Sequence, residues 1–90
     1  MVQYEIRIQG RVQGVGFRYF VQRRAAEFDI SGWVMNQSDG SVLVMAQGTP
    51  KDMEPFIDHL RSGPSAARVT QFIKTEMPSL ENFTGFQIRY

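Results

Sequence analysis

The sequence predicts an α+β fold with the element order β-α-β-β-α-β and one further short strand at its end. Residues 2–9 alternate between apolar and polar side chains, which is typical of a half-buried strand. Apolar side chains recur at helical spacing over residues 17–28 and again over residues 53–60. Between these stretches, two strand-like segments flank Asp39-Gly40, a strong hairpin signal because glycine accepts the positive φ that such turns require.

The first strand, at residues 2–9, is predicted to bury only one of its faces. Its apolar positions are Val2, Tyr4, Ile6 and Ile8, and its polar positions are Gln3, Glu5, Arg7 and Gln9. We expect the polar face to be wet, because in this element order both helices cover the opposite face of the sheet.

The first helix is predicted after a loop that contains Gly10, Gly14 and Gly16. Residues 30–36 and 41–47 then form the two strands of the hairpin, since each is a short apolar run next to turn residues. The apolar stripe of the helix is formed by Phe17, Phe20, Val21, Ala25 and Phe28.

The second helix is predicted to open at Thr49-Pro50 and to end at Gly63-Pro64, a glycine cap followed by a residue that cannot continue a helix. Pro55 suits a helix only within its first turn, so we expect the start to lie nearer Asp52. Strands are predicted at 67–76 and 86–90. The buried stripe of this helix is formed by Met53, Phe56, Ile57 and Leu60.

Two right-handed β-α-β crossovers joined by a hairpin give the ferredoxin-like α/β sandwich, with a four-stranded antiparallel sheet, a short terminal strand and two helices on one face. One domain spanning residues 1–90 is expected from this length. The first two strands run parallel, so their carboxyl ends lie at one edge of the sheet. That edge is predicted to bring the 10–18 loop and Arg18 close to Asn36.

The composition excludes much of the usual catalytic chemistry. The 90 residues are 42% hydrophobic and include no cysteine and one histidine, His59, which excludes disulfides, thiolate zinc sites and multi-histidine metal centres. The net charge of +1 is low for a protein that holds a polyanion by charge alone. No apolar run approaches a membrane span or a signal peptide, so a cytoplasmic protein without membrane or nucleic-acid partners is expected.

The loop GRVQGVGFR has the features of an anion site. Gly10, Gly14 and Gly16 allow successive backbone N–H groups to converge, and these lead into a helix N-terminus, which also favours negative charge. Arg18 lies in the first helical turn, where a cation is unfavourable by about 0.3–1 kcal/mol, so a bound phosphate would compensate it. Neither nucleotide fingerprint is present, because there is no GxxxxGK[ST] and Tyr19 replaces the last glycine of GxGxxG.

Other interpretations stay open for single residues. A glycine-rich turn with a solvated arginine is common, and an asparagine at a strand end often bonds its own turn. The run 14–20 partly matches an RNA-binding aromatic motif, but its aromatic residues fall at helical spacing, which disfavours RNA binding. His59 is expected at the surface or the core edge, and Trp33 is expected to pack on the sheet.

Two motifs resemble one family. VQGVGFR at 12–18, together with GWVMNQSDGSVLVMAQG at 32–48, is similar to the acylphosphatases, and the similarity extends over essentially the whole chain. It implies the same fold and the hydrolysis of acyl phosphates without metal or cofactor. It also implies that Arg18 binds the phosphoryl group and that Asn36 orients water. The backbone amides implied in phosphate binding are those of Gln13, Gly14, Val15, Gly16, Phe17 and Arg18.

An acyl phosphate fits a site with so few chemical groups. Its leaving group is a carboxylate, whose acid has a pKa of about 4, so it departs without a proton donor or a metal. The expected partners are a small acyl phosphate and inorganic phosphate as product and inhibitor, and the chain is expected to be a monomer. A non-catalytic phosphate-binding module of the same fold is the alternative. Met35 departs from the family, many members of which carry Lys or Arg before the asparagine.

Overall fold

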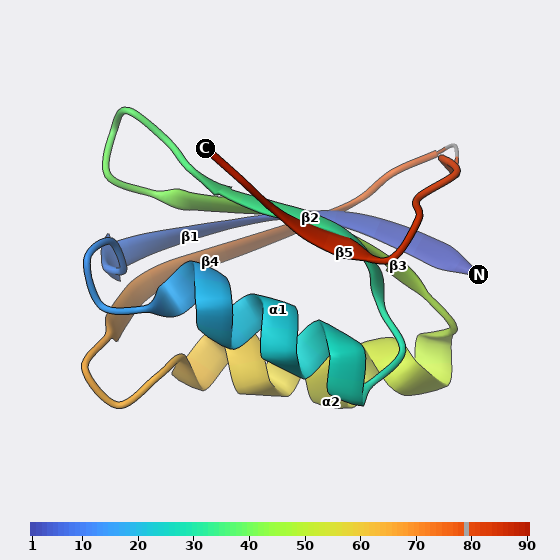
Figure 1. Ribbon diagram of the computed structural model, residues 1–90, viewed down its shortest axis with the longest axis horizontal. Helices are drawn as coiled ribbons and strands as arrows, with labels where there is room; N and C mark the ends of the chain where they lie inside the picture. The colour runs from blue at the N-terminus through green and yellow to red at the C-terminus, as the bar shows by residue number, and fades with distance from the viewer. Residues whose placement is uncertain (79) are drawn as a thin grey trace.

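A computed structural model describes residues 1–78 and 80–90 and arranges them as one sheet covered on one face by two helices (Figure 1). Within these residues the strands and helices closely follow the segments predicted from the sequence. They are β1 (Val2–Arg11), α1 (Phe17–Glu27), β2 (Ser31–Asn36), β3 (Val42–Gly48), α2 (Pro50–Ser62), β4 (Arg68–Glu76) and β5 (Phe86–Arg89).

The strand order of the sheet is β4-β1-β3-β2-β5. The first four of these strands pair antiparallel, as expected for a ferredoxin-like α+β fold, whereas β5 pairs with β2 in parallel and makes the sheet mixed. Met35 pairs with Arg89 in this parallel register. The chain end therefore emerges beside Asn36, at the edge where β1 leads into α1.

The hydrophobic core fills the space between the sheet and the helices. Ile6 and Val34 from the sheet, Val21 from α1 and Phe56 from α2 are fully buried. Each such side chain contributes roughly 1.5–3 kcal/mol through burial. Val12 and Phe17 are buried as well, so both ends of the loop between β1 and α1 are anchored in the core.

The expectation of a wet polar face on β1 is wrong at Gln3, which is 1% exposed. The segment after β4 crosses this end of the strand: the amide of Met77 donates to the carbonyl of Gln3 at 2.8 Å, and the amide of Glu81 donates to Gln3 Oε1 at 3.0 Å. The side-chain amide of Gln3 in turn donates to Glu81 Oε1 at 3.3 Å. Gln3 is therefore buried by a segment that is distant in the sequence, although it lies on the face that the alternation of residues 2–9 predicts to be exposed.

The expectation that α2 starts nearer Asp52 is also wrong, because the helix begins at Pro50 and continues through Pro55. The hydroxyl of Thr49 accepts a hydrogen bond from the Asp52 amide at 3.1 Å, which caps the helix at this earlier point. Pro55 cannot donate to the carbonyl of Lys51. Lys51 is exposed, so solvent can satisfy that carbonyl.

Candidate active site

The loop between β1 and α1 owes its shape to two glycines with left-handed backbone angles. Gly14 has φ 74° and Gly16 has φ 77°, and no atom lies within 4 Å of a Cβ added at either position. Backbone conformation and not crowding therefore requires glycine at both sites. These angles turn the chain into a tight loop of the kind in which successive N–H groups can face one ligand.

Helix α1 begins directly at this loop without a capping side chain. Gly16 is the N-cap residue, no side chain accepts a hydrogen bond from the first turn, and the first turn contains no acidic residue. The first N–H groups of a helix have no intrahelical partner, and the helix dipole adds positive potential at this end. The end of α1 is therefore suited to receive an anion.

Arg18 lies half-buried in the first turn, where its charge opposes the helix dipole. Its Nη1 atom donates to the carbonyl oxygen of Arg89 at 3.3 Å. Its guanidinium carbon lies 4.6 Å from the centroid of the Tyr90 ring. Arg89 and Tyr90 thus supply part of the compensation that we expect for the charge of Arg18 at this end of the helix.

Asn36 is the last residue of β2, and its backbone pairs with Val42 of β3. Its side-chain oxygen Oδ1 is buried and accepts no hydrogen bond from the residues that the structure describes. An unpaired buried acceptor costs about 1–3 kcal/mol, so native proteins keep such groups mainly where they have a task. A donor supplied by a ligand or by water would satisfy this oxygen.

One pocket of about 190 Å³ contains Arg18, Asn36, Gly14 and Gly16. The sequence predicted that the topology would place Arg18 near Asn36, and the pocket joins them. This volume is smaller than the roughly 300–1,000 Å³ of sites for drug-sized ligands, which fits a small anion with a short substituent. The lining is Val12, Gly14, Gly16, Phe17, Arg18, Tyr19, Asn36, Ile88 and Tyr90.

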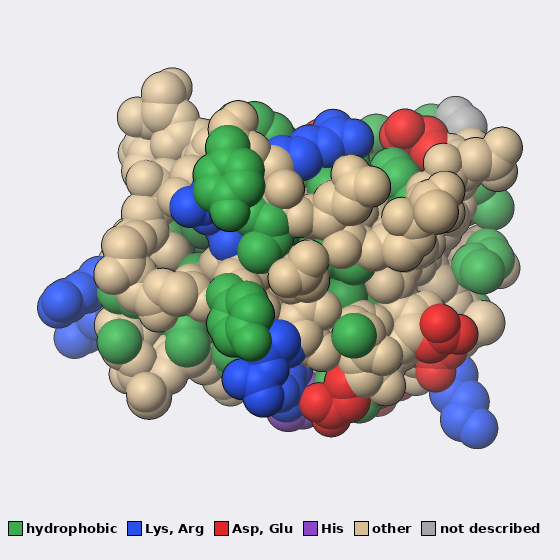
Figure 2. Space-filling view, in the orientation of Figure 1, with side chains coloured by type: hydrophobic (Ala, Val, Ile, Leu, Met, Phe, Trp, Pro, Cys, Tyr) green, Lys and Arg blue, Asp and Glu red, His purple; other side chains and the backbone are tan. Residues whose placement is uncertain are grey.

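Two of the lining side chains are exposed aromatic rings. Tyr19 is 60% and Tyr90 94% exposed. In the orientation of Figure 1, hydrophobic and basic side chains are exposed together over α1 and around the C-terminal end (Figure 2). The entrance of the pocket is therefore both aromatic and cationic.

Larger hollows elsewhere lack this combination. One of about 290 Å³ lies over the start of β1 and α2, and its lining includes Tyr4, Asp58 and Lys74. Another of about 480 Å³ lies along α1 next to Phe86. The first includes Pro50 at the start of α2 and the second includes Gly85, but neither combines a strand-to-helix glycine loop with a helix N-terminus, so chemistry and not size selects the candidate site.

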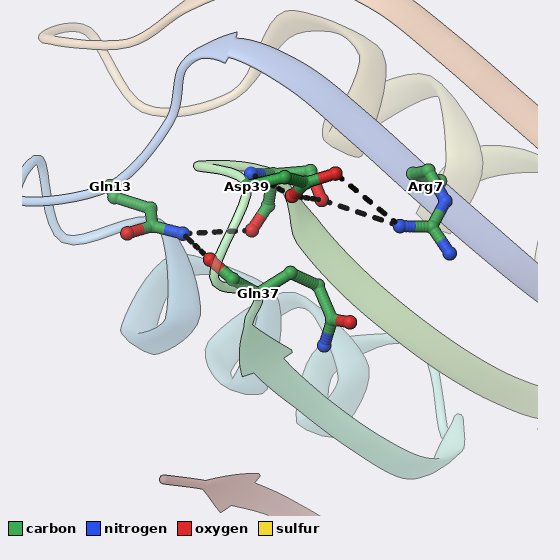
Figure 3. Close-up of polar contacts among 5 residues, drawn as sticks. Arg7, Gln13, Gln37 and Asp39 are labelled. Carbon is green, nitrogen blue, oxygen red and sulfur yellow. Dashed lines mark hydrogen bonds and ion pairs between the residues drawn. The ribbon is translucent and has the colours of Figure 1, made fainter.

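Two of the predicted loop residues do not line the pocket. Val15 packs partly buried against the hydrophobic core. Gln13 turns its side chain toward the β2–β3 hairpin, where its Nε2 atom donates to the carbonyls of Gln37 at 2.8 Å and Ser41 at 2.9 Å (Figure 3). The role predicted for these residues concerns their backbone amides, and it stays a prediction.

The tip of that hairpin is held by its own polar contacts. Asp39 Oδ1 accepts hydrogen bonds from the amide of Ser41 at 2.9 Å and from its hydroxyl at 2.6 Å, and Asp39 Oδ2 lies 4.0 Å from Arg7 Nη1. The Ser41 hydroxyl bond is the main reason why the pKa of Asp39 lies below its usual value, with the Ser41 amide and the charge of Arg7 acting in the same direction. The hairpin beside Asn36 is therefore held by several polar contacts.

Sequence reasoning missed four residues of the pocket. Val12 and Tyr19 directly flank the predicted loop residues, whereas Ile88 and Tyr90 depend on β5, whose parallel pairing with β2 has no local sequence signal. His59 is exposed on α2 with its ring 5.3 Å from that of Phe28, and Trp33 is half-buried beneath the guanidinium of Arg89. Among the described residues, no three or more His, Cys, Asp or Glu side chains are grouped so that they could hold a metal ion.

Comparison with known proteins decides the family. The family model described as Acylphosphatase matches residues 4–88. The chain belongs to the acylphosphatase family. The acylphosphatase of Bacillus subtilis is 43% identical over 90 residues, covering 100% of this chain and 99% of that protein. The acylphosphatase of Salinibacter ruber is 46% identical over 83 residues, covering 92% of this chain and 87% of that protein.

The fold of the family is shared as well. The crystal structure of the Bacillus subtilis acylphosphatase superposes with a TM-score of 0.96 over 100% of both chains. An acylphosphatase structure from Coxiella burnetii, 32% identical, superposes with a TM-score of 0.92 over 98% of this chain and 92% of that one. The resemblance carried by the two sequence motifs is thereby confirmed, and so is the ferredoxin-like α+β fold. Within the described residues, no helix of this acylphosphatase family member is long and apolar enough to cross a membrane.

Proposed function

We propose that this member of the acylphosphatase family hydrolyses acyl phosphates to a carboxylate and inorganic phosphate, without a metal or a cofactor. The proposal rests on the set of groups that line one small pocket. It combines a positive-φ glycine loop, a helix N-terminus, a guanidinium and a buried amide oxygen without a partner.

The phosphoryl group would bind to the loop and to Arg18. The positive φ angles of Gly14 and Gly16, which other residues adopt only at a cost, fold residues 13–18 into a tight loop. The backbone amides of such a loop are suited to bind the non-bridging oxygens of the phosphoryl group. Arg18 would add charge-assisted, bidentate hydrogen bonds from a group that never loses its proton. These contacts strengthen as charge builds up on the transferring phosphoryl group.

Asn36 would orient the attacking water. Its Oδ1 atom, which has no partner among the described residues, can accept a hydrogen bond from that water. The water oxygen forms a bond to phosphorus while the bond from phosphorus to the acyl oxygen breaks, and that electron pair leaves on the carboxylate. An asparagine does not accept a proton near neutral pH, so the proton of the water passes to a phosphoryl oxygen of the substrate itself.

The pocket favours anhydrides over ordinary phosphate esters. No Asp, Glu or His is among the described residues that line it. An alkoxide leaving group would need such an acid or a metal, whereas a carboxylate with a pKa of about 4 does not. The chemistry that the site can support thus corresponds to the leaving group of an acyl phosphate.

The proposal includes a monomeric protein of the cytoplasm that is inhibited by its product. All the groups invoked come from one chain, so the proposed mechanism needs no second subunit, and phosphate would compete for the same loop. Size-exclusion chromatography, cell fractionation and inhibition by added phosphate test these three points.

The decisive experiment measures phosphate release from acetyl phosphate in the presence of EDTA, corrected for spontaneous hydrolysis. We expect turnover that EDTA leaves unchanged and that a phosphate monoester, p-nitrophenyl phosphate, does not show. If the folded protein binds inorganic phosphate but leaves acetyl phosphate intact, the proposal is wrong and the protein is a phosphate-binding module.

A further inference from the structure

A pair of hydrogen bonds connects the phosphate loop to the hairpin that follows Asn36. Gln13 Nε2 donates to the carbonyl of Gln37 at 2.8 Å and to that of Ser41 at 2.9 Å (Figure 3). A side-chain amide nitrogen carries two hydrogens, so both donors of Gln13 are used. Both acceptors are backbone atoms of one short turn.

The two acceptor carbonyls lie at the neck of the hairpin. The amide of Gln37 donates to the carbonyl of Ser41 at 2.8 Å, and the amide of Gly40 donates to the carbonyl of Gln37 at 3.1 Å. Each carbonyl thus accepts one backbone bond and one bond from Gln13. Asp39 also holds the turn by accepting two hydrogen bonds from Ser41, so Gln13 is attached to a turn with several hydrogen bonds of its own.

This attachment lies directly next to Asn36. Asn36 precedes Gln37 in the chain, and its partner in the sheet, Val42, follows Ser41. The side chain of Gln13 therefore joins the loop to the two residues next to the Asn36–Val42 pair, one on each strand of the hairpin and both on its turn side. Among the described residues, no other side-chain hydrogen bond links residues 13–17 to another part of the molecule.

We propose that the side chain of Gln13 is a positioning residue that sets the spacing between the phosphate loop and Asn36. The inference rests on the proposed function, in which the loop and Arg18 hold phosphorus while Asn36, on the other side of the pocket, holds the water. Rates of such reactions fall about 10²-fold for a displacement of 1 Å. A tie between the two sides would thus act on turnover and not on phosphate affinity.

The test compares Gln13→Met with the wild-type protein. Methionine keeps the length of the side chain and removes both donors. We expect kcat for acetyl phosphate to fall about 10- to 100-fold. The inhibition constant of inorganic phosphate is expected to change less than about threefold, because the loop and Arg18 stay intact.

Gln3→Met is the matched control. Gln3 is another glutamine whose side chain connects segments far apart in the chain, here through Glu81, but it is buried at the opposite end of β1. Thermal unfolding of both variants measures any general loss of stability. We expect Gln3→Met to keep the wild-type kcat at a temperature where both variants are folded.

A double variant distinguishes a positioning role of Gln13 from a merely structural one. If Gln13 acts through Asn36, adding Gln13→Met to Asn36→Ala produces no further loss of kcat, whereas independent effects would multiply. A wild-type kcat in Gln13→Met, a loss that multiplies with Asn36→Ala, or a parallel loss of phosphate affinity overturns the proposal. A wild-type protein without turnover refutes the proposed function itself, and this is measured first.

Discussion

The guanidinium of Arg18 lies 4.6 Å from the ring centroid of Tyr90, the last residue of the chain. The same guanidinium donates to the carbonyl of Arg89 at 3.3 Å. Both contacts exist because β5 runs parallel to β2 and delivers the chain end to the N-terminus of α1. Ile88 and Tyr90 thus form part of the wall of the candidate active site, and Arg89 and Tyr90 contact the cation in it.

This contact predicts an effect of Tyr90 on phosphate affinity. A cation–π contact at an exposed site contributes about 0.5–1 kcal/mol, so Tyr90→Ala is expected to raise the inhibition constant of phosphate about two- to fivefold. Tyr90→Phe keeps the ring and serves as the control. An equal loss in both variants would show that the hydroxyl, and not the ring, is what matters.

Arg18 is expected to be required for binding as well as for turnover. Hydrogen bonds to charged groups contribute about 1.5–3 kcal/mol, so Arg18→Ala should weaken phosphate binding roughly 10- to 150-fold. Arg18→Lys should recover little of it, because an ammonium group lacks the planar pair of donors. Isothermal titration calorimetry with inorganic phosphate measures both, and wild-type affinity in Arg18→Ala would contradict the assigned role.

Asn36→Ala is expected to separate turnover from binding. Loss of one aligned polar group at a reacting centre typically lowers kcat by about 10²–10³, while phosphate affinity should change less than about threefold. The free energy of unfolding should not fall, and we expect it to rise by up to about 1 kcal/mol, because the substitution removes a buried oxygen without a partner. Steady-state kinetics and urea unfolding test the two halves of this prediction independently, and wild-type turnover would refute the mechanism.

The charge on Asp39 predicts a pH-dependent contribution to stability. The hydroxyl of Ser41, followed by its amide and the charge of Arg7, lowers the pKa of Asp39 from its ordinary value of 3.8. A lowered pKa in the folded state stabilises the protein above the unfolded value, and this stabilisation is lost as the pH falls through the folded value. We therefore expect Asp39→Asn to unfold at a lower temperature than the wild-type protein at pH 7.

The difference between the two proteins should disappear in acid. Other carboxylates titrate in both proteins, so their effects cancel when the two unfolding temperatures are compared at each pH from 7 down to below 3.8. A difference that persists unchanged at the acid end would mean that the side-chain shape at this position, and not its charge, is responsible.

Much of the site could be predicted because it depends on local backbone preferences and on connectivity. The alternation in residues 2–9 and the helical spacing after Phe17 indicated the first crossover. That crossover makes the first two strands parallel, which placed Arg18 and Asn36 at one edge of the sheet. Glycines at 14 and 16 indicated the tight loop, since only glycine adopts the required angles without strain.

Apart from the start of α2, the features that sequence patterns did not indicate depend on segments far apart in the chain. Gln3 is buried where Met77 and Glu81 bond to it, and Tyr90 contacts Arg18 because β5 pairs with β2 in parallel. The same holds for the bonds of Gln13 to the hairpin. The sequence by itself therefore determined the elements and the chemistry of the loop. What surrounds Arg18 and what holds the loop beside Asn36 were decided only by tertiary packing. These contacts join segments that are distant in the sequence, so no local pattern indicates them.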